Sequence, residues 1–415
     1  MSRNQPYRPL SIRTINGVGA FFNKLGIRPK LDADDILSRV EKATGLPRPP
    51  KGWDAGGLEV LVNALNSESQ LNTIGRLAAR GMLAGIIGNY VKLTDWFDKH
   101  PEEEKQVIEK PLMIVGLPRT GTSAMHGLMA TDPGNRSPLF WEVNSPLPRP
   151  HPDHFDDDPR IEAMAKQLEM QYKMAPGFAA IHKMDATMPQ ECVANMQQMM
   201  YGITLTLTWY VPSYRKWLMQ ADPEPALRFH KRFLQMMQAT EPDTRPEIKR
   251  WLLKTPGHLS SLPAIFKLFP DAQIVFTHRN PVDVIGSVCS FVWTLSGMFT
   301  DTAQVPELIG EEQATSWNQL LQLSMRDRAL LAEHKNQFHD IYFNDIASKP
   351  FETVFGIYQK FGLTPPDDLE QRMQQYLDES PRGKHGKHEY TLADYHLTAN
   401  GERARFKEYI DRFGL

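Results

Sequence analysis

The residues best suited to chemistry lie in a glycine-bounded loop, G-L-P-R-T-G-T-S, at positions 116–123. The apolar run at 112–115 predicts a short buried strand before it, and apolar residues recur at helical spacing after it. Glycine lets the backbone turn its N–H groups inward, and the free N–H groups of a helix's first turn face an anion. We therefore expect a phosphate-binding loop, the alternative being an ordinary strand-to-helix turn.

The loop differs from that of a nucleotide-hydrolysing protein at one position. Its spacing, G-x-x-x-x-G, is that of a Walker A loop, but Thr122 stands where that motif has lysine. The only cation inside this loop is Arg119. The pattern predicts a loop that binds a nucleotide phosphate without acting as an ATPase. The candidate binding residues are Arg119, Thr120, Gly121, Thr122 and Ser123.

A second phosphate site is predicted where the apolar run 273–277 leads into H-R-N-P-V-D-V-I-G-S. Asn280 is suited to cap a helix and Pro281 to its first position. This places Arg279 at the end of a strand and Ser287 two turns into a helix. An arginine and a serine that meet at one point can bind a phosphate through charge-assisted hydrogen bonds.

Together, G-L-P-R-T-G-T-S and H-R-N-P-V-D-V-I-G-S resemble the two nucleotide signatures of the sulfotransferases that use 3′-phosphoadenosine 5′-phosphosulfate (PAPS). The resemblance extends to 251–259 and 268–272 and is closest to the bacterial and tyrosyl-protein-like branches, which carry P-R-x-G-T. It implies that the first loop binds the 5′-phosphosulfate of this co-substrate. It also implies that Arg279 and Ser287, eight residues apart as in the family, bind the 3′-phosphate.

The resemblance also implies three catalytic side chains. Lys254 lies where relatives place a lysine on the bridging oxygen. Glu142, 23 residues past Arg119, lies near the general base of the tyrosyl-protein branch. His258 is four residues beyond Lys254, whereas the cytosolic branch places its catalytic histidine two residues beyond its lysine. Histidine has the better intrinsic pKa, but the closer branch favours Glu142 as the base, with His258 as the alternative.

A late basic segment, P-R-G-K-H-G-K-H, contains Arg382 and Lys384. In sulfotransferases a segment of this kind closes over the adenosine 3′-phosphate, so the resemblance implies that role for both residues. A solvated surface turn is the alternative.

The elements that must position these residues form an α/β fold, a P-loop-like parallel sheet flanked by helices. Strands are expected at 112–115, 250–254, 273–277 and 338–343. Residues 1–110 contain no convincing strand and predict a helical N-terminal region, with Asp32 near the start of one amphipathic helix. The domain division expected is therefore 1–110 and a sulfotransferase α/β domain at 111–415.

A mainly helical insert is expected at about 140–250, beginning with a proline-rich loop from Pro138 to Pro159. Its Met-rich and aromatic run from Glu191 to Tyr210 is either plain core or the pocket of an apolar or phenolic hydroxylated acceptor. Glu191 and His182 could reach the site or make structural hydrogen bonds.

Composition excludes several classes of protein. The chain has 415 residues and net charge −2, so bulk charge gives no reason to expect nucleic-acid binding. Two cysteines are too few for a zinc cluster, and no metal motif is present, so no metal is expected. The longest apolar tract, 82–87, is far short of the roughly 20 residues of a membrane span, and no secretory signal is evident. We expect a cytoplasmic enzyme with a small-molecule acceptor, possible self-association being left open.

Two rival functions remain at this point. A P-loop kinase or NTPase needs the Walker lysine, and Thr122 occupies its position. A non-catalytic nucleotide-binding protein on the same fold would bind the donor and transfer nothing. Lys254, Glu142 and His258 are the residues that argue against it.

Overall fold

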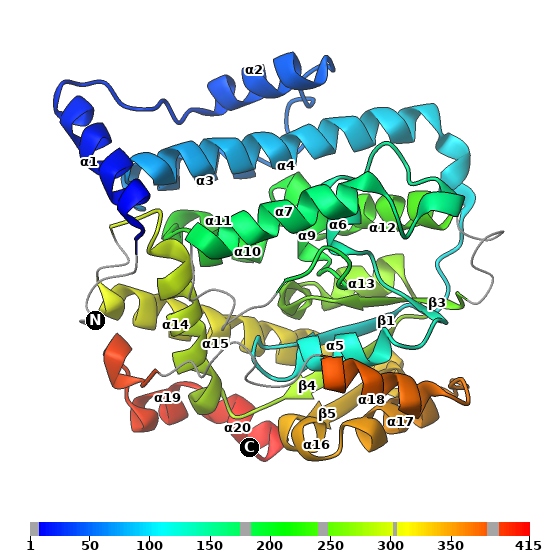
Figure 1. Ribbon diagram of the computed structural model, residues 1–415. Coiled ribbons are helices and arrows are strands. Elements are labelled where there is room, and N and C mark those ends of the chain that lie inside the picture. Colours follow the sequence, from blue (N-terminus) through cyan, green and yellow to red (C-terminus); the bar gives the residue numbers. More distant parts are fainter. Residues whose placement is uncertain (1–7, 175–183, 240–247, 302–304, 380–389) are drawn as a thin grey trace.

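The centre of the computed structural model is one sheet of five parallel strands in the order β2-β3-β1-β4-β5 (Figure 1). The structure describes residues 8–174, 184–239, 248–301, 305–379 and 390–415. The strands are β1 (Leu112–Gly116), β2 (Asn135–Arg136), β3 (Arg250–Lys254), β4 (Gln273–His278) and β5 (Phe338–Tyr342). The predicted α/β class and the four predicted strands are confirmed. The two-residue β2 was not predicted, because it is too short to carry a periodic pattern.

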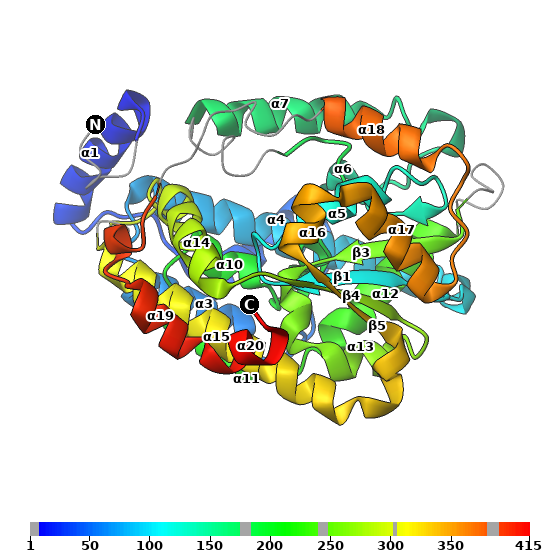
Figure 2. The same cartoon turned by 90° about the horizontal axis from the view of Figure 1, so that it is seen from below.

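Helices cover both faces of this sheet (Figures 1 and 2). Alternate residues of β1 point to opposite faces, so Leu112 and Ile114 join one apolar core while Met113 and Val115 join the other. The smaller core is closed by α5 (Thr122–Met129), α16 (Phe343–Ser348), α17 (Pro350–Phe361) and α18 (Leu369–Glu379). The larger is closed by α13 (Leu262–Leu268), α14 (Pro281–Ser296), α15 (Pro306–Leu330) and α20 (Lys407–Phe413) together with most helices of the two regions described next, and α19 (Ala399–Arg405) lies against α14.

The N-terminal residues are helical, as expected, and those from Leu31 onward contribute side chains to the larger core. Asp32 caps its helix by accepting a hydrogen bond from the Asp35 N–H at 3.0 Å, which confirms the predicted start. The helices are α1 (Leu10–Lys24), α2 (Ala33–Thr44), α3 (Gly57–Ser67) and α4 (Thr73–Lys99). Because one core joins them to the sheet, a boundary near residue 110 stays a prediction. Among the described residues, no helix is long and apolar enough to cross a membrane.

The insert between β1 and β3 is helical, with two differences from expectation. The expectation of an irregular proline-rich loop is wrong in part, because Glu142 accepts the Leu139 N–H at 2.7 Å and starts a short helix there. The Met-rich run is broken where Met200 adopts a left-handed backbone (φ 53°). The helices are α6 (Phe140–Asn144), α7 (Pro159–Met174), α9 (Val193–Met196), α10 (Ile203–Thr208), α11 (Pro212–Gln220) and α12 (Glu224–Gln238).

A buried polar cluster joins β4, β5 and the C-terminal helix. Asp340 accepts hydrogen bonds from Arg328 at 2.5 and 2.8 Å and is 2.8 Å from Nε2 of His278. The other ring nitrogen, Nδ1, is 2.7 Å from the Tyr409 hydroxyl. Burial would raise the pKa of Asp340, but the hydrogen bonds from His278 and Arg328 outweigh it and hold that pKa well below its usual range. The cluster fixes the end of β4, directly before Arg279.

We expect Asp340→Asn to lower the free energy of unfolding by about 1–3 kcal/mol at neutral pH. Because the folded-state pKa of Asp340 is lowered, its stabilisation is present above the pKa of the unfolded carboxyl, about 4, and is lost as pH falls below it. Urea unfolding at pH 7 and at about pH 2.5 measures both effects, since the variant should lose part of the acid dependence below about pH 4. Asp411→Asn, which removes an exposed pair with Lys407, is the control. Equal stability of the two variants would contradict the prediction.

Candidate functional site

The loop after β1 has the backbone of an anion-binding site. Gly116 (φ 156°), Arg119 (φ 68°) and Gly121 (φ 92°) all have positive φ. A Cβ at Gly116 would lie 2.2 Å from the Thr277 hydroxyl oxygen, so only glycine fits between the loop and β4. Helix α5 begins at Thr122, directly after the last of these turns, so its first N–H groups point into the same concavity.

Thr120 ties this loop to the sheet. Its fully buried hydroxyl lies 2.6 Å from the Leu117 carbonyl oxygen and 2.6 Å from the Thr277 hydroxyl. Both contacts face into the protein, so Thr120 can offer only its backbone N–H to a ligand. The side chain is therefore a structural part of the predicted nucleotide site.

Two arginines lie at the same edge of the sheet. Arg279 follows β4, and its Nη1 donates to the Arg119 carbonyl oxygen at 3.0 Å. Its guanidinium carbon lies 3.9 Å from the centre of the Phe343 ring, which fixes its orientation. Surrounding protein lowers the pKa of Arg119, and the nearby charge of Arg279 lowers it further. Two cations held close together at the carboxyl ends of parallel strands are suited to an anionic ligand.

The helix after β4 carries the other half of this predicted phosphate site. Asn280 caps α14 by accepting the Val282 N–H at 3.1 Å, and Pro281 is its first residue, both as predicted. Ser287 is buried on this helix. A Cβ at the preceding residue, Gly286, would lie 3.1 Å from the Tyr390 ring, so the C-terminal chain covers the helix here. Arg382 and Lys384 lie outside the described residues, and their predicted role stays a prediction.

A buried ion pair lies beside the loop, where β3 ends. Nζ of Lys254 is 2.5 Å from Oε1 of Glu191 and 3.2 Å from Oγ of Ser123. The Thr255 hydroxyl donates to Oε2 of Glu191 at 3.3 Å. The Lys254 side chain is 4% exposed and that of Glu191 is 23% exposed, so the lysine is enclosed while the carboxylate remains within reach of a ligand. The Cys192 N–H, bound to the Lys254 carbonyl oxygen at 3.0 Å, holds the two segments together.

Glu142, the base favoured by the sequence, is held elsewhere. Its buried carboxylate is bound by Nη2 of Arg136 at 2.5 Å and by Nη1 at 2.9 Å, and it also accepts the Leu139 N–H. A carboxylate that is paired with a guanidinium on both oxygens is a weak proton acceptor. The contacts described for Glu142 thus fit a structural role, and they do not join it to Lys254.

His258, the alternative base, is buried in the larger core beside His230. Burial, and to a smaller extent the nearby His230, lower its pKa to about 3, so the ring is neutral at physiological pH. Neither ring nitrogen has a hydrogen-bond partner among the described residues. The structure therefore does not bring His258 into contact with Lys254, Glu191 or Ser123.

The sequence identified Lys254 and Ser123 but left Glu191 open between the site and a structural role. The only sequence feature that pointed to Glu191 was its place at the start of the Met-rich run, between the two nucleotide motifs. Arg136, the partner of Glu142, was missed, because nothing in a two-residue strand marks it. Within the described ranges, no group of three or more histidine, cysteine, aspartate or glutamate side chains is placed to hold a metal ion.

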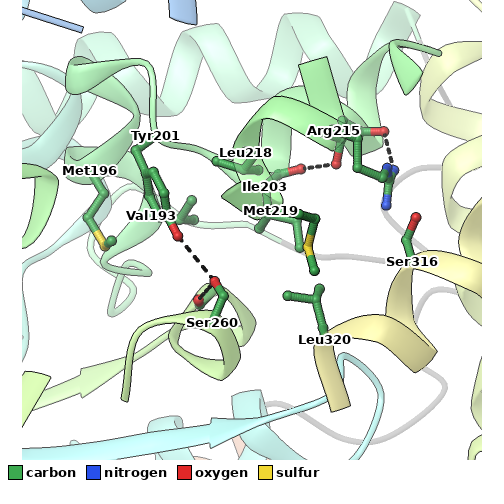
Figure 3. Close-up of a pocket in the computed structure, with 12 residues that line it drawn as sticks. Val193, Met196, Tyr201, Ile203, Arg215, Leu218, Met219, Ser260, Ser316 and Leu320 are labelled. Atoms are coloured by element: carbon green, nitrogen blue, oxygen red, sulfur yellow. Dashed lines mark hydrogen bonds between the residues drawn. The ribbon is translucent and has the colours of Figure 1, made fainter. Parts of the chain in front are cut away.

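A mostly apolar pocket is lined by residues that follow both members of the ion pair in the sequence (Figure 3). One wall begins at Val193, two residues beyond Glu191, and another at Gly257, three residues beyond Lys254. Its polar groups include a Tyr201 hydroxyl 3.2 Å from that of Ser260. The lining residues are Val193, Met196, Tyr201, Ile203, Thr206, Arg215, Leu218, Met219, Gly257, Ser260, Ser316 and Leu320. An apolar cavity with a few polar groups is the usual form of a small-molecule site.

Comparison with known proteins agrees with this geometry. A model of the sulfotransferase family matches residues 111–367. The omega-hydroxy-beta-dihydromenaquinone-9 sulfotransferase Stf3 of Mycobacterium bovis and of Mycobacterium tuberculosis is 23% identical over 329 residues, which cover 75% of this chain and 76% of that protein.

Two crystal structures share the fold over almost the whole chain. Sulfotransferase STF1 from Mycobacterium tuberculosis H37Rv is 29% identical, with a TM-score of 0.80, and the match covers 92% of this chain and all of that one. Sulfotransferase STF9 from Mycobacterium avium is 25% identical, with a TM-score of 0.83, and the match covers 94% of this chain and 98% of that one.

Proposed function

Because this chain belongs to the sulfotransferase family, we propose that it transfers a sulfuryl group from PAPS to a hydroxyl of a hydrophobic or phenolic small molecule. The observation that supports this most strongly is the meeting of three features at one edge of the sheet. They are the anion-binding loop, the adjacent guanidinium groups of Arg119 and Arg279, and the buried Lys254–Glu191 pair.

The donor nucleotide is proposed to lie across the ends of β1 and β4. The N–H groups from Gly121 to Ser123, the Arg119 guanidinium and the Thr122 hydroxyl would hold the 5′-phosphosulfate, and Thr120 would contribute its N–H. Arg279 and Ser287 would bind the 3′-phosphate. Arg382 and Lys384 are proposed to close over it, since the described chain resumes at Tyr390 against α14.

Sulfuryl transfer needs charge stabilisation and a base more than covalent help from the protein. In the proposed step the acceptor oxygen attacks sulfur in line, and the bond from sulfur to the 5′-phosphate oxygen breaks. The electron pair of that bond stays on the leaving phosphate, where Lys254 stabilises it together with the loop N–H groups. The acceptor proton passes to a carboxylate.

We propose Glu191 as that carboxylate, in place of Glu142. The support is its contact with Lys254, its partial exposure and its place in the chain two residues before Val193, which lines the apolar pocket. Lys254 neutralises Glu191 in the free enzyme. If Lys254 turns toward the leaving phosphate when the donor binds, the carboxylate is released to accept a proton. In this proposal Glu142 and His258 have structural roles.

The acceptor is proposed to place its apolar part in the pocket lined by α9, α10, α11 and α15 and its hydroxyl beside Glu191. The lining favours an apolar or aromatic body over a free sugar. The Stf3 relative, whose name gives a hydroxylated dihydromenaquinone as its substrate, supports a hydrophobic alcohol as the class. A cytoplasmic enzyme with a helical N-terminal region at 1–110 stays our proposal.

Calorimetric titration with adenosine 3′,5′-bisphosphate, compared with AMP and ATP, tests the donor site. We expect micromolar binding that prefers the ligand with a 3′-phosphate. Arg279→Ala should weaken this binding by about 10- to 100-fold, because it removes a charge-assisted contact with the 3′-phosphate. Arg326→Ala, on the exposed side of α15, is the matched control and should change nothing. ATP binding that is equal or tighter and independent of Arg279 would refute the proposal and favour the kinase alternative.

A further inference from the structure

The first helix, α1, is attached to the body by one narrow face. Ile12 is its buried residue, and the Asn16 side-chain oxygen accepts the Ile74 N–H at 3.0 Å. Gly19 lies against Thr73 so closely that a Cβ there would be 2.0 Å from the threonine hydroxyl oxygen. Figures 1 and 2 both show α1 at the periphery of the molecule. The small and polar residues of α1 therefore face the protein.

The opposite face of α1 carries exposed apolar side chains at helical spacing, which we call the α1 stripe. Ile15, Val18 and Phe22 follow one another three and four residues apart, and so do Val18, Phe21 and Leu25. Seven of the sixteen exposed large apolar side chains in the described parts of the chain lie between residues 10 and 27, so the patch is concentrated here. The stripe is Leu10, Ile15, Val18, Phe21, Phe22, Leu25 and Ile27.

The charged side chains of residues 1–31 are all basic, and two of them, Arg8 and Lys30, pair with Asp301 and Asp32. Residues 1–31 contain six arginine and lysine side chains and no aspartate or glutamate, although the whole chain has a net charge of −2. Arg13 and Lys24 lie on α1 itself, and Arg28 follows it. A helix with an exposed apolar face and basic flanks has the properties that favour the boundary of an anionic bilayer.

We propose that α1 docks the enzyme on the surface of a membrane that contains anionic lipid. Phe21 and Phe22 would enter the region between head groups and acyl chains, and Arg13 and Lys24 would remain at the phosphates. The contacts of Arg8 with the Gly297 carbonyl at 2.8 Å and with Asp301 at 2.8 Å hold the start of α1 in place, so the stripe is presented by a fixed helix. This inference does not depend on the identity of donor or acceptor.

Co-sedimentation of the full chain with vesicles tests the proposal. Vesicles of phosphatidylcholine with about one third phosphatidylglycerol should bind the protein, and binding should weaken as salt is raised. The triple variant Val18→Ser, Phe21→Ser, Phe22→Ser should reduce the partition coefficient between vesicle and water by about 100-fold. The reason is that three apolar side chains that would be buried in the membrane are lost. The pair Val107→Ser and Leu330→Ser, which removes comparably exposed apolar side chains elsewhere, is the control and should bind as wild type.

A charge variant separates the electrostatic from the apolar contribution to vesicle binding. Arg13→Gln with Lys24→Gln should weaken binding to the anionic vesicles by about tenfold and have little effect on the weak binding to pure phosphatidylcholine. Titration with adenosine 3′,5′-bisphosphate should be unchanged in every variant, which shows that the fold and donor site are intact. Vesicle binding that is absent, or equal in the stripe variant, would overturn the proposal. So would a dimer in light scattering that the stripe variant abolishes without any vesicle binding, because a second copy would then cover the stripe.

Discussion

Replacing Lys254 with methionine is expected to lower kcat by about 10²- to 10³-fold, with a smaller effect on donor affinity. The physical reason is that the lysine charge is proposed to act on the leaving phosphate, where negative charge grows only as the bond to sulfur breaks. Methionine keeps the volume of the enclosed stem, and Glu191 retains a hydrogen bond from Thr255, so the fold should survive.

The measurement is single-turnover transfer of labelled sulfate from PAPS to a phenolic or hydrophobic alcohol acceptor, together with a donor titration. Lys267→Met is the matched control, because Lys267 is an exposed lysine of α13 that pairs with Glu224. A kcat within about threefold of wild type would show that the transition state does not need the Lys254 charge.

The second large effect is expected at Glu191. Glu191→Gln should lower kcat by about 10²- to 10⁴-fold, because the amide cannot take the acceptor proton. It keeps the shape of the side chain and can still hydrogen-bond to Lys254 and Thr255, so donor binding should persist. The limb of the pH–rate profile that reports deprotonation of the base should disappear in this variant.

Glu142→Gln and His258→Asn distinguish a catalytic from a structural role. Glu142→Gln removes the ion pair between Glu142 and the buried Arg136 guanidinium, so we expect it to destabilise the protein by about 3–5 kcal/mol. Protein that remains folded should keep most of its kcat, as should His258→Asn. The opposite result would be a Glu142→Gln variant that is inactive at unchanged stability and a Glu191→Gln variant that is active. That result would identify Glu142 as the base, as the sequence predicts, and would refute the proposal of Glu191.

Much of the donor site could be predicted from the sequence because it depends on local chemistry. The glycines at 116 and 121 mark the turns of the loop, and both have positive φ. Asn280 and Pro281 mark a helix start, which in turn positions Arg279 at the end of β4. Parallel strands bring their carboxyl ends to one edge, so residues that follow three different strands meet there.

The choice of base was beyond the sequence because it depends on which side chains pair across the fold. Glu142 forms a buried ion pair with Arg136, which lies on β2, a strand that pairs with β3. No local sequence pattern predicts that ion pair. His258 lies only four residues beyond Lys254, the last residue of β3, yet the short helix that begins at Pro256 turns it into the core. Glu191 reaches Lys254 only because the insert folds back against β3.

The sequence by itself determined the parallel α/β fold, the strand, loop and helix from 112 to 129, and the family, because periodicity, turn residues and motif spacing are properties of neighbouring residues. The tertiary structure alone decided which carboxylate contacts Lys254, which histidine is buried and which face of α1 is left uncovered. An amphipathic pattern states that a helix has two faces, but it does not state which of them the rest of the chain covers. That depends on long-range packing, and here Asn16 and Gly19 face the protein while the apolar stripe faces outward.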